Sequence, residues 1–207
     1  QASYGPCSPS GKGQKIDLTK GNAGLSELII GLGWDPAEQS GSSGFLGGLF
    51  GGKKAEFDCD ASALLLDANG KFSNKDNIVY FNHLKSACGS VTHLGDNLTG
   101  GGDGDDEQII IQLQRVPSEV HKIVFVVNIY DCQKRKQDFG MINNAFIRVV
   151  DKASLQEITR YNLTENYAGK TALIVGEVYR HQGEWKFGAL GESTQDFSLS
   201  SLLQRYM

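Results

Sequence analysis

Short apolar runs that alternate with polar positions recur along the chain and predict strands rather than long helices. The most regular run, 120–130, is rich in β-branched and aromatic residues and predicts a central strand. The runs 171–180 and 184–189 flank a short polar turn and predict a hairpin. Further strands are expected at 14–18, 25–34, 57–63, 78–81, 108–113, 145–150 and 155–162.

Helical spacing is confined to two short segments. Residues 197–206 place Leu199, Leu202 and Leu203 on one face, which predicts a short C-terminal helix. Residues 133–144 are polar with spaced apolar positions, which suggests a helical turn. Many short strands with so little helix indicate an all-β fold, and we expect a β-sandwich of two mostly antiparallel sheets with a few short helices.

The strand pattern divides the chain into a tail and one domain. Residues 1–13 lack periodicity and are expected to form a tail, followed by a single domain at 14–207. Within that domain, 36–54 is rich in glycine and predicts a flexible insertion. The insertion also carries apolar side chains that are unusual in a linker, namely Phe45, Leu46, Leu49 and Phe50.

Composition narrows the class of protein. The 207 residues are 40% hydrophobic and 21% charged, with a formal net charge of −4, which fits a soluble globular protein and gives no basic patch for nucleic acid. No apolar run approaches the ~20 residues of a membrane-spanning helix. Residues 1–14 lack the apolar core of a signal peptide, so we expect a cytoplasmic protein.

The cysteines give no sign of a zinc or redox motif. Cys7, Cys59, Cys88 and Cys132 are scattered, and none forms a CxxC pair. Cys59 and Cys132 lie near strand-like runs and are most simply explained as thiols of the core.

The most unusual stretch is the acidic, glycine-rich loop at 95–107. It contains four aspartates and one glutamate, and no Lys or Arg occurs from Ser86 to Gln114. Carboxylates that a folded turn brings together need a counter-cation, and hard oxygen ligands in a flexible turn suit Ca²⁺. The alternative is an acidic surface turn that binds nothing.

A second acidic segment lies within the predicted strand at 57–63. Alternation puts Asp58 and Asp60 on one face, with Cys59 and Ala61 facing the core. Aspartate is a poor strand former, so two on one face resemble half of a metal site. The alternative is a face exposed to solvent.

Taken in order, these segments resemble the TerD family of tellurium-resistance and bacterial stress proteins. The resemblance spans roughly 14–206. The resembling segments are Lys20-Gly21-Asn22, Gly31-Leu32-Gly33-Trp34-Asp35, Phe57-Asp58-Cys59-Asp60-Ala61-Ser62-Ala63, Gly95-Asp96-Asn97-Leu98-Thr99-Gly100, Gly104-Asp105-Asp106-Glu107, Arg148 with Asp151, Thr171-Ala172, Gly176-Glu177-Val178-Tyr179-Arg180 and Trp185-Lys186-Phe187. The long insertion at 36–54 and the three glycines at 100–102 depart from the family pattern.

The resemblance implies a β-sandwich that binds calcium and has no established enzymatic activity. It implies other tellurite-resistance proteins as partners, with a membrane protein as a further candidate. It implies up to two nearby Ca²⁺ ions, and it would supply their ligands from both acidic segments. Carried over by position, the candidate ligands are Asp58, Asp60, Asp96, Asn97, Leu98 (carbonyl), Asp103, Gly104 (carbonyl), Asp105, Asp106 and Glu107.

Two other classes of function remain open at this point: an enzyme, either a hydrolase or a reductase, and a protein that binds a membrane surface. A metal-dependent hydrolase usually combines His with carboxylates, and His93 is the only histidine near the acidic loop. A tellurite reductase would use paired thiols, which the sequence lacks. The third alternative is a Ca²⁺-bridged contact with a membrane surface, with the apolar residues of the 36–54 insertion at the tip.

Overall fold

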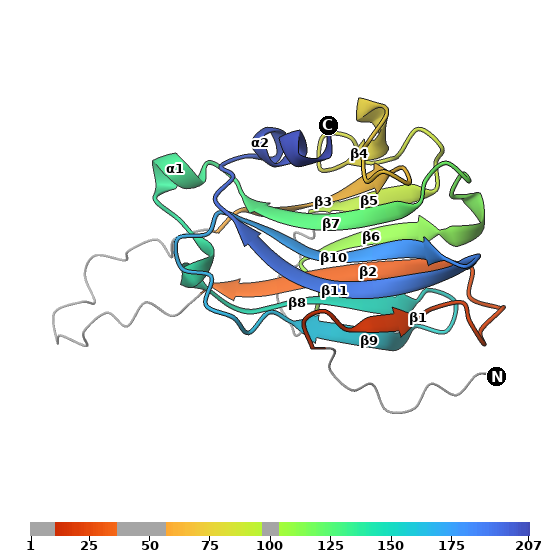
Figure 1. The fold of residues 1–207 in the computed structure, drawn as a ribbon. Helices are drawn as coiled ribbons and strands as arrows, with labels where there is room; N and C mark the ends of the chain where they lie inside the picture. Colours follow the sequence, from red (N-terminus) through yellow and green to blue (C-terminus); the bar gives the residue numbers. More distant parts are fainter. Residues whose placement is uncertain (1–10, 37–56, 97–103) are drawn as a thin grey trace, which may run out of the picture.

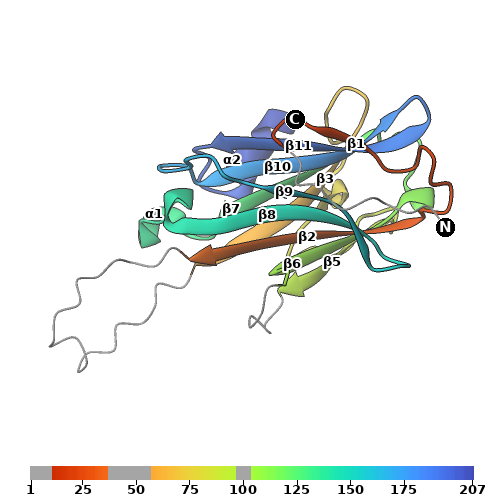
Figure 2. The same ribbon diagram turned by 90° about the horizontal axis from the view of Figure 1, so that it is seen from below.

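Two antiparallel sheets pack face to face in the computed structural model, which describes residues 11–36, 57–96 and 104–207 (Figures 1 and 2). The six-stranded sheet has the order β1-β11-β10-β7-β3-β4, with β1 (Lys15–Asp17), β11 (Glu184–Thr194), β10 (Ala172–His181), β7 (Lys122–Ile129), β3 (Cys59–Leu66) and β4 (Ile78–Val79). The five-stranded sheet has the order β5-β6-β2-β8-β9, with β5 (Val91–Asp96), β6 (Glu107–Gln112), β2 (Glu27–Pro36), β8 (Ile142–Asp151) and β9 (Gln156–Asn162). The predicted all-β sandwich is therefore confirmed.

The main core fills the space between the sheets. From β7 it takes the alternating residues Ile123, Phe125, Val127 and Ile129, which agrees with the prediction of a central strand. The intervening residues Val124 and Val126 belong to a second cluster on the outer face of the same sheet. β7 is thus buried on both faces, which explains why its sequence is almost continuously apolar.

The C-terminal helix covers this second cluster. Helix α2 (Leu199–Leu203) starts at Ser198, whose hydroxyl accepts a hydrogen bond from Ser201 N, and it buries Leu202 on the six-stranded sheet. The helix was predicted correctly. In the run Leu64-Leu65-Leu66, which continues the strand predicted at 57–63, Leu65 faces the main core while Leu64 and Leu66 lie in the outer cluster with Leu202.

Two local features differ from or refine the sequence-based expectation. Strand β5 begins at Val91, in a stretch where no strand was predicted, and runs to Asp96 at the start of the acidic loop. The hairpin between β10 and β11 turns through Gln182 and Gly183, whose positive φ values of 52° and 81° are those of a two-residue hairpin turn.

Helix α1 (Cys132–Arg135) marks one end of the sandwich, at the left of Figure 1. It confirms the helical turn expected near 133–144. Cys59, at the first position of β3, pairs with Ile129, at the last position of β7, so both acidic segments discussed below are close to this end.

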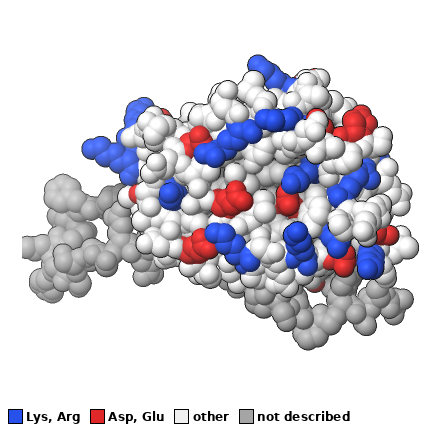
Figure 3. All heavy atoms as spheres, viewed as in Figure 1, with Lys and Arg blue, Asp and Glu red and all other residues white. Residues whose placement is uncertain are grey.

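Charges of both signs are interspersed on the face seen in Figure 3, and no single sign dominates it. On the six-stranded sheet, Lys122 pairs with Glu177 at 2.8 Å and Lys186 with Asp17 at 3.1 Å. Among the residues described, none of the helices has the length and apolar character needed to cross a membrane.

Candidate metal centre

The two acidic segments meet in the folded chain. The backbone N–H of Ala61 in β3 donates a hydrogen bond of 2.6 Å to Glu107 Oε2 in β6 of the opposite sheet. On this edge of β3, the short strand β4 pairs only with Ala63 and Leu64, so among the described residues Ala61 has no neighbouring strand on that side. The buried Glu107 carboxylate therefore joins the two sheets where the β3 edge would otherwise leave a backbone donor without a partner.

Carboxylates from both acidic segments raise the pKa of one thiol, that of Cys59. Burial raises the pKa of Cys59 well above its usual value, and nearby negative charges raise it further. Those charges belong to Asp60, Glu107, Asp58 and Asp106. The expected juxtaposition of 58–60 with part of the acidic loop is thus present in the fold.

Asp106 is held against the end of β2. Its backbone N–H donates to Leu32 O at 2.8 Å, and its Oδ2 accepts from Trp34 N at 2.7 Å. These two bonds fix the direction of the chain as it enters β6.

Asp105 takes a different course and lies over the outer face of the five-stranded sheet. Arg148 on β8 binds it in a bidentate manner, with Nε to Oδ1 at 2.7 Å and Nη2 to Oδ2 at 3.0 Å. The carboxylate lies directly over Gly31, where any Cβ atom would overlap it. A glycine is therefore required at this position of β2. Arg148 supplies the counter-charge that the sequence around the loop lacks, and Asp105 raises the pKa of its guanidinium.

Asp58 and Asp60 lie on the β3 side of the centre. Asp58 is exposed just before β3, and its Oδ2 is 3.7 Å from Nη2 of Arg135 in α1. Asp60 is half-buried and belongs to the outer face of the six-stranded sheet, because Cys59 and Ala61 on either side of it face the core. The predicted alternation of this strand is confirmed.

Not all candidate ligands can be placed. Asn97, Leu98 and Asp103 lie outside the described residues, and Asp96 is described only by its backbone, which pairs with Glu107. Gly104 is described, and its carbonyl oxygen lies 3.3 Å from where a Cβ on Gly33 would be. The predicted 36–54 insertion falls almost wholly in the undescribed segment 37–56.

The described residues alone do not form a metal site. In 11–36, 57–96 and 104–207, no three His, Cys, Asp or Glu side chains converge closely enough to hold a metal ion. What they provide is a set of carboxylates around Cys59, from Asp58, Asp60, Asp106 and Glu107, and carboxylate oxygen is the donor that Ca²⁺ prefers. A full shell would need further ligands from 96–103.

Two residues of this region were not assigned roles from the sequence. Arg148 appeared only as part of the family resemblance, and its position in an apolar strand was the available signal. His93 was noted only as the histidine near the acidic loop. It is buried, Nδ1 accepts from Gly95 N at 2.9 Å, and Nε2 lies 3.3 Å from Glu107 Oε2. His93 thus lies beside Glu107 on the β5 side, but its Nε2 makes no hydrogen bond among the described residues.

Comparison with known proteins agrees with this fold. The family model described as TerD domain matches residues 11–206. The chain belongs to the TerD family. It is 60% identical over 196 residues to the stress response protein SCP2 of Bacillus subtilis (strain 168), covering 95% of this chain and 97% of that protein. It is 46% identical over 181 residues to the tellurium resistance protein TerD of Serratia marcescens, covering 87% and 88% of the two chains.

Solved structures show the same architecture. A homologue of telluride resistance protein (TerD) from Streptomyces coelicolor A3(2) superposes with a TM-score of 0.60 at 19% sequence identity, covering 84% of this chain and 92% of the other. At that identity the likeness concerns the TerD-type fold. The resemblance inferred from the sequence is confirmed by the family match, and the relatives carry the names of stress and resistance proteins.

Proposed function

We propose that this TerD-family protein is a calcium-binding, non-enzymatic module of a bacterial stress or tellurite-resistance system, in which it acts as a scaffold for other resistance proteins. The observation that carries the proposal is the hydrogen bond of 2.6 Å from Ala61 N to Glu107 Oε2. It brings the Asp58–Asp60 segment next to the acidic loop, and neither segment could fill a calcium shell alone.

Electrostatics gives the reason for a cation at this point. Two carboxylates ~4 Å apart repel by about 4 kcal/mol at an effective dielectric constant of ~20. Asp58, Asp60, Asp106 and Glu107 all act on the thiol of Cys59. Bound calcium would supply positive charge and oxygen coordination there. Asp60, Asp106 and Glu107 do not converge on one point in the described fold, so the shell would depend on ligands from residues 96–103.

The assignment of Asp105 within the proposed site differs from that of its neighbours. Both of its oxygens accept from Arg148. Its first role is therefore to anchor the loop on β2 and β8, and its direct contact with calcium stays a prediction.

The alternative functions have less support. A catalytic metal site would use His with carboxylates, but the buried His93 accepts a backbone hydrogen bond at Nδ1 and faces Glu107 with Nε2. The apolar residues proposed for a membrane contact lie outside the described residues. The names of the relatives are those of stress and resistance proteins, and neither names an enzymatic activity.

A calcium titration followed by thermal unfolding tests the proposal. Because a ligand that binds only the folded state stabilises it by RT ln(1 + [L]/Kd), calcium at 100 times Kd should add about 2.7 kcal/mol and raise the Tm. Asp106→Asn and Asp60→Asn should reduce or abolish the increase.

The matched control is Glu119→Gln. Glu119 is exposed, and it precedes β7 at the end of the sandwich far from Cys59. This variant should keep the full calcium-dependent increase. No change in Tm at millimolar calcium, or an increase that survives both aspartate substitutions, would rule out the proposed site.

A further inference from the structure

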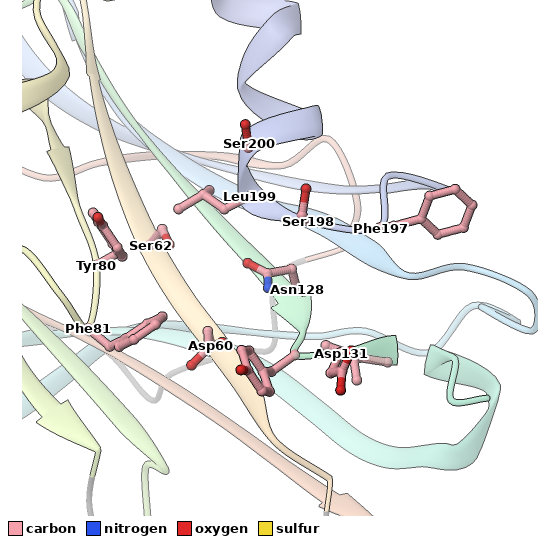
Figure 4. A pocket seen from close by; sticks show the side chains of 12 residues that line it. Asp60, Ser62, Tyr80, Phe81, Asn128, Asp131, Phe197, Ser198, Leu199 and Ser200 are labelled. Carbon is pink, nitrogen blue, oxygen red and sulfur yellow. The ribbon is translucent and has the colours of Figure 1, made fainter. Parts of the chain in front are cut away.

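A pocket of about 360 Å³ opens on the outer face of the six-stranded sheet, beside the start of α2 (Figure 4). Its walls come from β3, the turn after β4, the end of β7 and the segment that leads into α2. This volume is within the range of small-ligand sites. Apart from Asp60, the pocket shares no residue with the candidate calcium ligands.

Two buried polar side chains line this pocket without a hydrogen-bond partner among the described protein groups. They are Ser62, which is 0% exposed, and Asn128, which is 6% exposed. The atoms concerned are Ser62 Oγ and Asn128 Oδ1. A buried polar group left unsatisfied costs about 1–3 kcal/mol, so a ligand that donates hydrogen bonds here gains affinity. In Figure 4, Ser62 lies below Leu199, and Asn128 lies between Ser198 and Asp131.

Among the remaining polar groups of the pocket, the charged ones are acceptors, whereas the Tyr and Ser hydroxyls can donate or accept. Asp60 and Asp131 contribute carboxylates, and the described lining residues include no Lys, Arg or His. The cation nearest to Asp131 is Lys134, at 3.8 Å, but its side chain is 84% exposed, so water screens the pair.

Aromatic rings form the rim. Phe81, Tyr130 and Phe197 line the pocket and are 45%, 49% and 52% exposed. Tyr130 already attracts a cation, because the guanidinium of Arg135 lies 5.4 Å from its ring centroid. Exposed aromatic faces next to carboxylates favour organic cations over neutral ligands.

We propose that this pocket binds an organic cation, a primary ammonium or guanidinium group on a short apolar stem. Such a group is a hydrogen-bond donor only, which matches the acceptors Asp60, Asp131 and Asn128 Oδ1. Its stem packs between the rim aromatics. The group can belong to a free amine or to a Lys or Arg side chain of another protein, and both sources present the same chemistry to the pocket.

NMR titration of the full ¹⁵N-labelled chain tests the proposal, with the side-chain amide of Asn128 as the reporter. The probes are N-acetylarginine amide and its neutral counterpart N-acetylcitrulline amide. The arginine probe should give saturable shifts, and the citrulline probe should bind about fivefold more weakly or not at all. Cadaverine and the peptide Gly-Arg-Gly then distinguish a free amine from a protein side chain, and binding of either one supports the proposal.

Two variants test the residues on which the proposed cation pocket depends. Asp131→Asn removes one charge at a position whose φ of 52° asparagine also adopts readily, and Tyr130→Leu keeps apolar area but removes the ring. Each should weaken the arginine probe about two- to fivefold. Leu84→Ala is the control, because Leu84 is 44% exposed and lies outside the pocket.

The proposal is overturned if citrulline binds as tightly as arginine, if no shift saturates, or if Asp131→Asn and Tyr130→Leu both bind like the parent protein. The titrations are run in EGTA, so they do not depend on calcium. A failure here leaves the calcium-dependent Tm unaffected, and loss of that Tm effect leaves these titrations interpretable.

Discussion

At the scale of single residues, the candidate centre depends on contacts that the sequence does not reveal. Asp105, Asp106 and Glu107 are adjacent in the chain, yet they bind Arg148, the backbone of Trp34 and the backbone of Ala61. Their chemistry could be predicted from the residue types. Their partners could not, because each one comes from a different strand that is distant in sequence.

Gly31→Ala tests the packing of Asp105 on β2. A Cβ at this position overlaps the Asp105 carboxylate, so the ion pair with Arg148 has to shift. We expect a loss of about 1–3 kcal/mol in the free energy of unfolding, measured by urea denaturation. Gly24→Ala is the control, because the nearest atom to its Cβ would be 3.9 Å away. Equal stability of the two variants would show that Asp105 is not fixed over Gly31.

Cysteine reactivity gives a second test at this scale. Burial raises the pKa of the Cys88 thiol, but its contacts with Ser86 at 3.4 Å and Ser90 at 2.9 Å outweigh this effect, and the net pKa is lowered. Burial and nearby carboxylates raise the pKa of Cys59 instead. In a Cys7→Ser background, iodoacetamide should therefore modify Cys88 first, as measured by mass spectrometry across pH.

The matched variant is Ser90→Ala, which removes one hydrogen bond to the Cys88 sulfur. It should move the midpoint of Cys88 alkylation to higher pH. Modification of Cys59 as fast as Cys88 in the folded protein would contradict the description of Cys59 as a buried thiol.

At the scale of elements, alternation predicted most strands because one face of each is buried. The hairpin of β10 and β11 and the C-terminal helix followed from local pattern alone. β5 was missed because its alternation is short and interrupted by Gly95, which has a φ of 85° next to a register shift. The location of Leu64 and Leu66 in a second cluster on the outer face was also missed, since it depends on α2 covering the sheet.

The packing of the C-terminal segment on the outer face of the six-stranded sheet makes the free energy of unfolding depend on pH. Burial, followed by the charge of Glu192, raises the pKa of Tyr206 to about 12. In the unfolded chain the value is ~10, so the native state favours the protonated phenol. The resulting stability is complete below pH ~10 and is lost as pH rises towards 12.

Tyr206→Phe should therefore reduce the loss of stability between pH 10 and 12 by about 1–3 kcal/mol, measured by chemical denaturation at each pH. Because lysines titrate in the same window, the quantity of interest is the difference from the parent protein. Tyr130→Phe, at an exposed tyrosine, is the control and should follow the parent. A variant Tyr206→Phe that follows the parent as well would show that the C-terminal segment does not shield this phenol.

At the scale of the whole molecule, the sandwich brings residues that are 46 positions apart into contact at one end. Family membership, fold and the meeting of the two acidic segments could be anticipated from the ordered motifs. The different partners of residues 105–107 and the pocket beside α2 could not be anticipated, because they arise from cross-strand register and from the placement of α1 and α2. The protein thus combines a proposed calcium centre with a separate proposed pocket for an organic cation.

Terbium luminescence tests the central claim most directly, because Tb³⁺ is a hard cation that replaces Ca²⁺ and is sensitised by a nearby indole. Trp34 N donates to Asp106, whereas Trp185, the second of the two tryptophans, packs against Arg180 towards the other end of the sandwich. We predict emission that calcium displaces, that Asp106→Asn and Trp34→Phe abolish, and that Trp185→Phe retains. No sensitised emission, or emission that depends on Trp185 and is indifferent to Asp106, would contradict a divalent cation held between the two acidic segments.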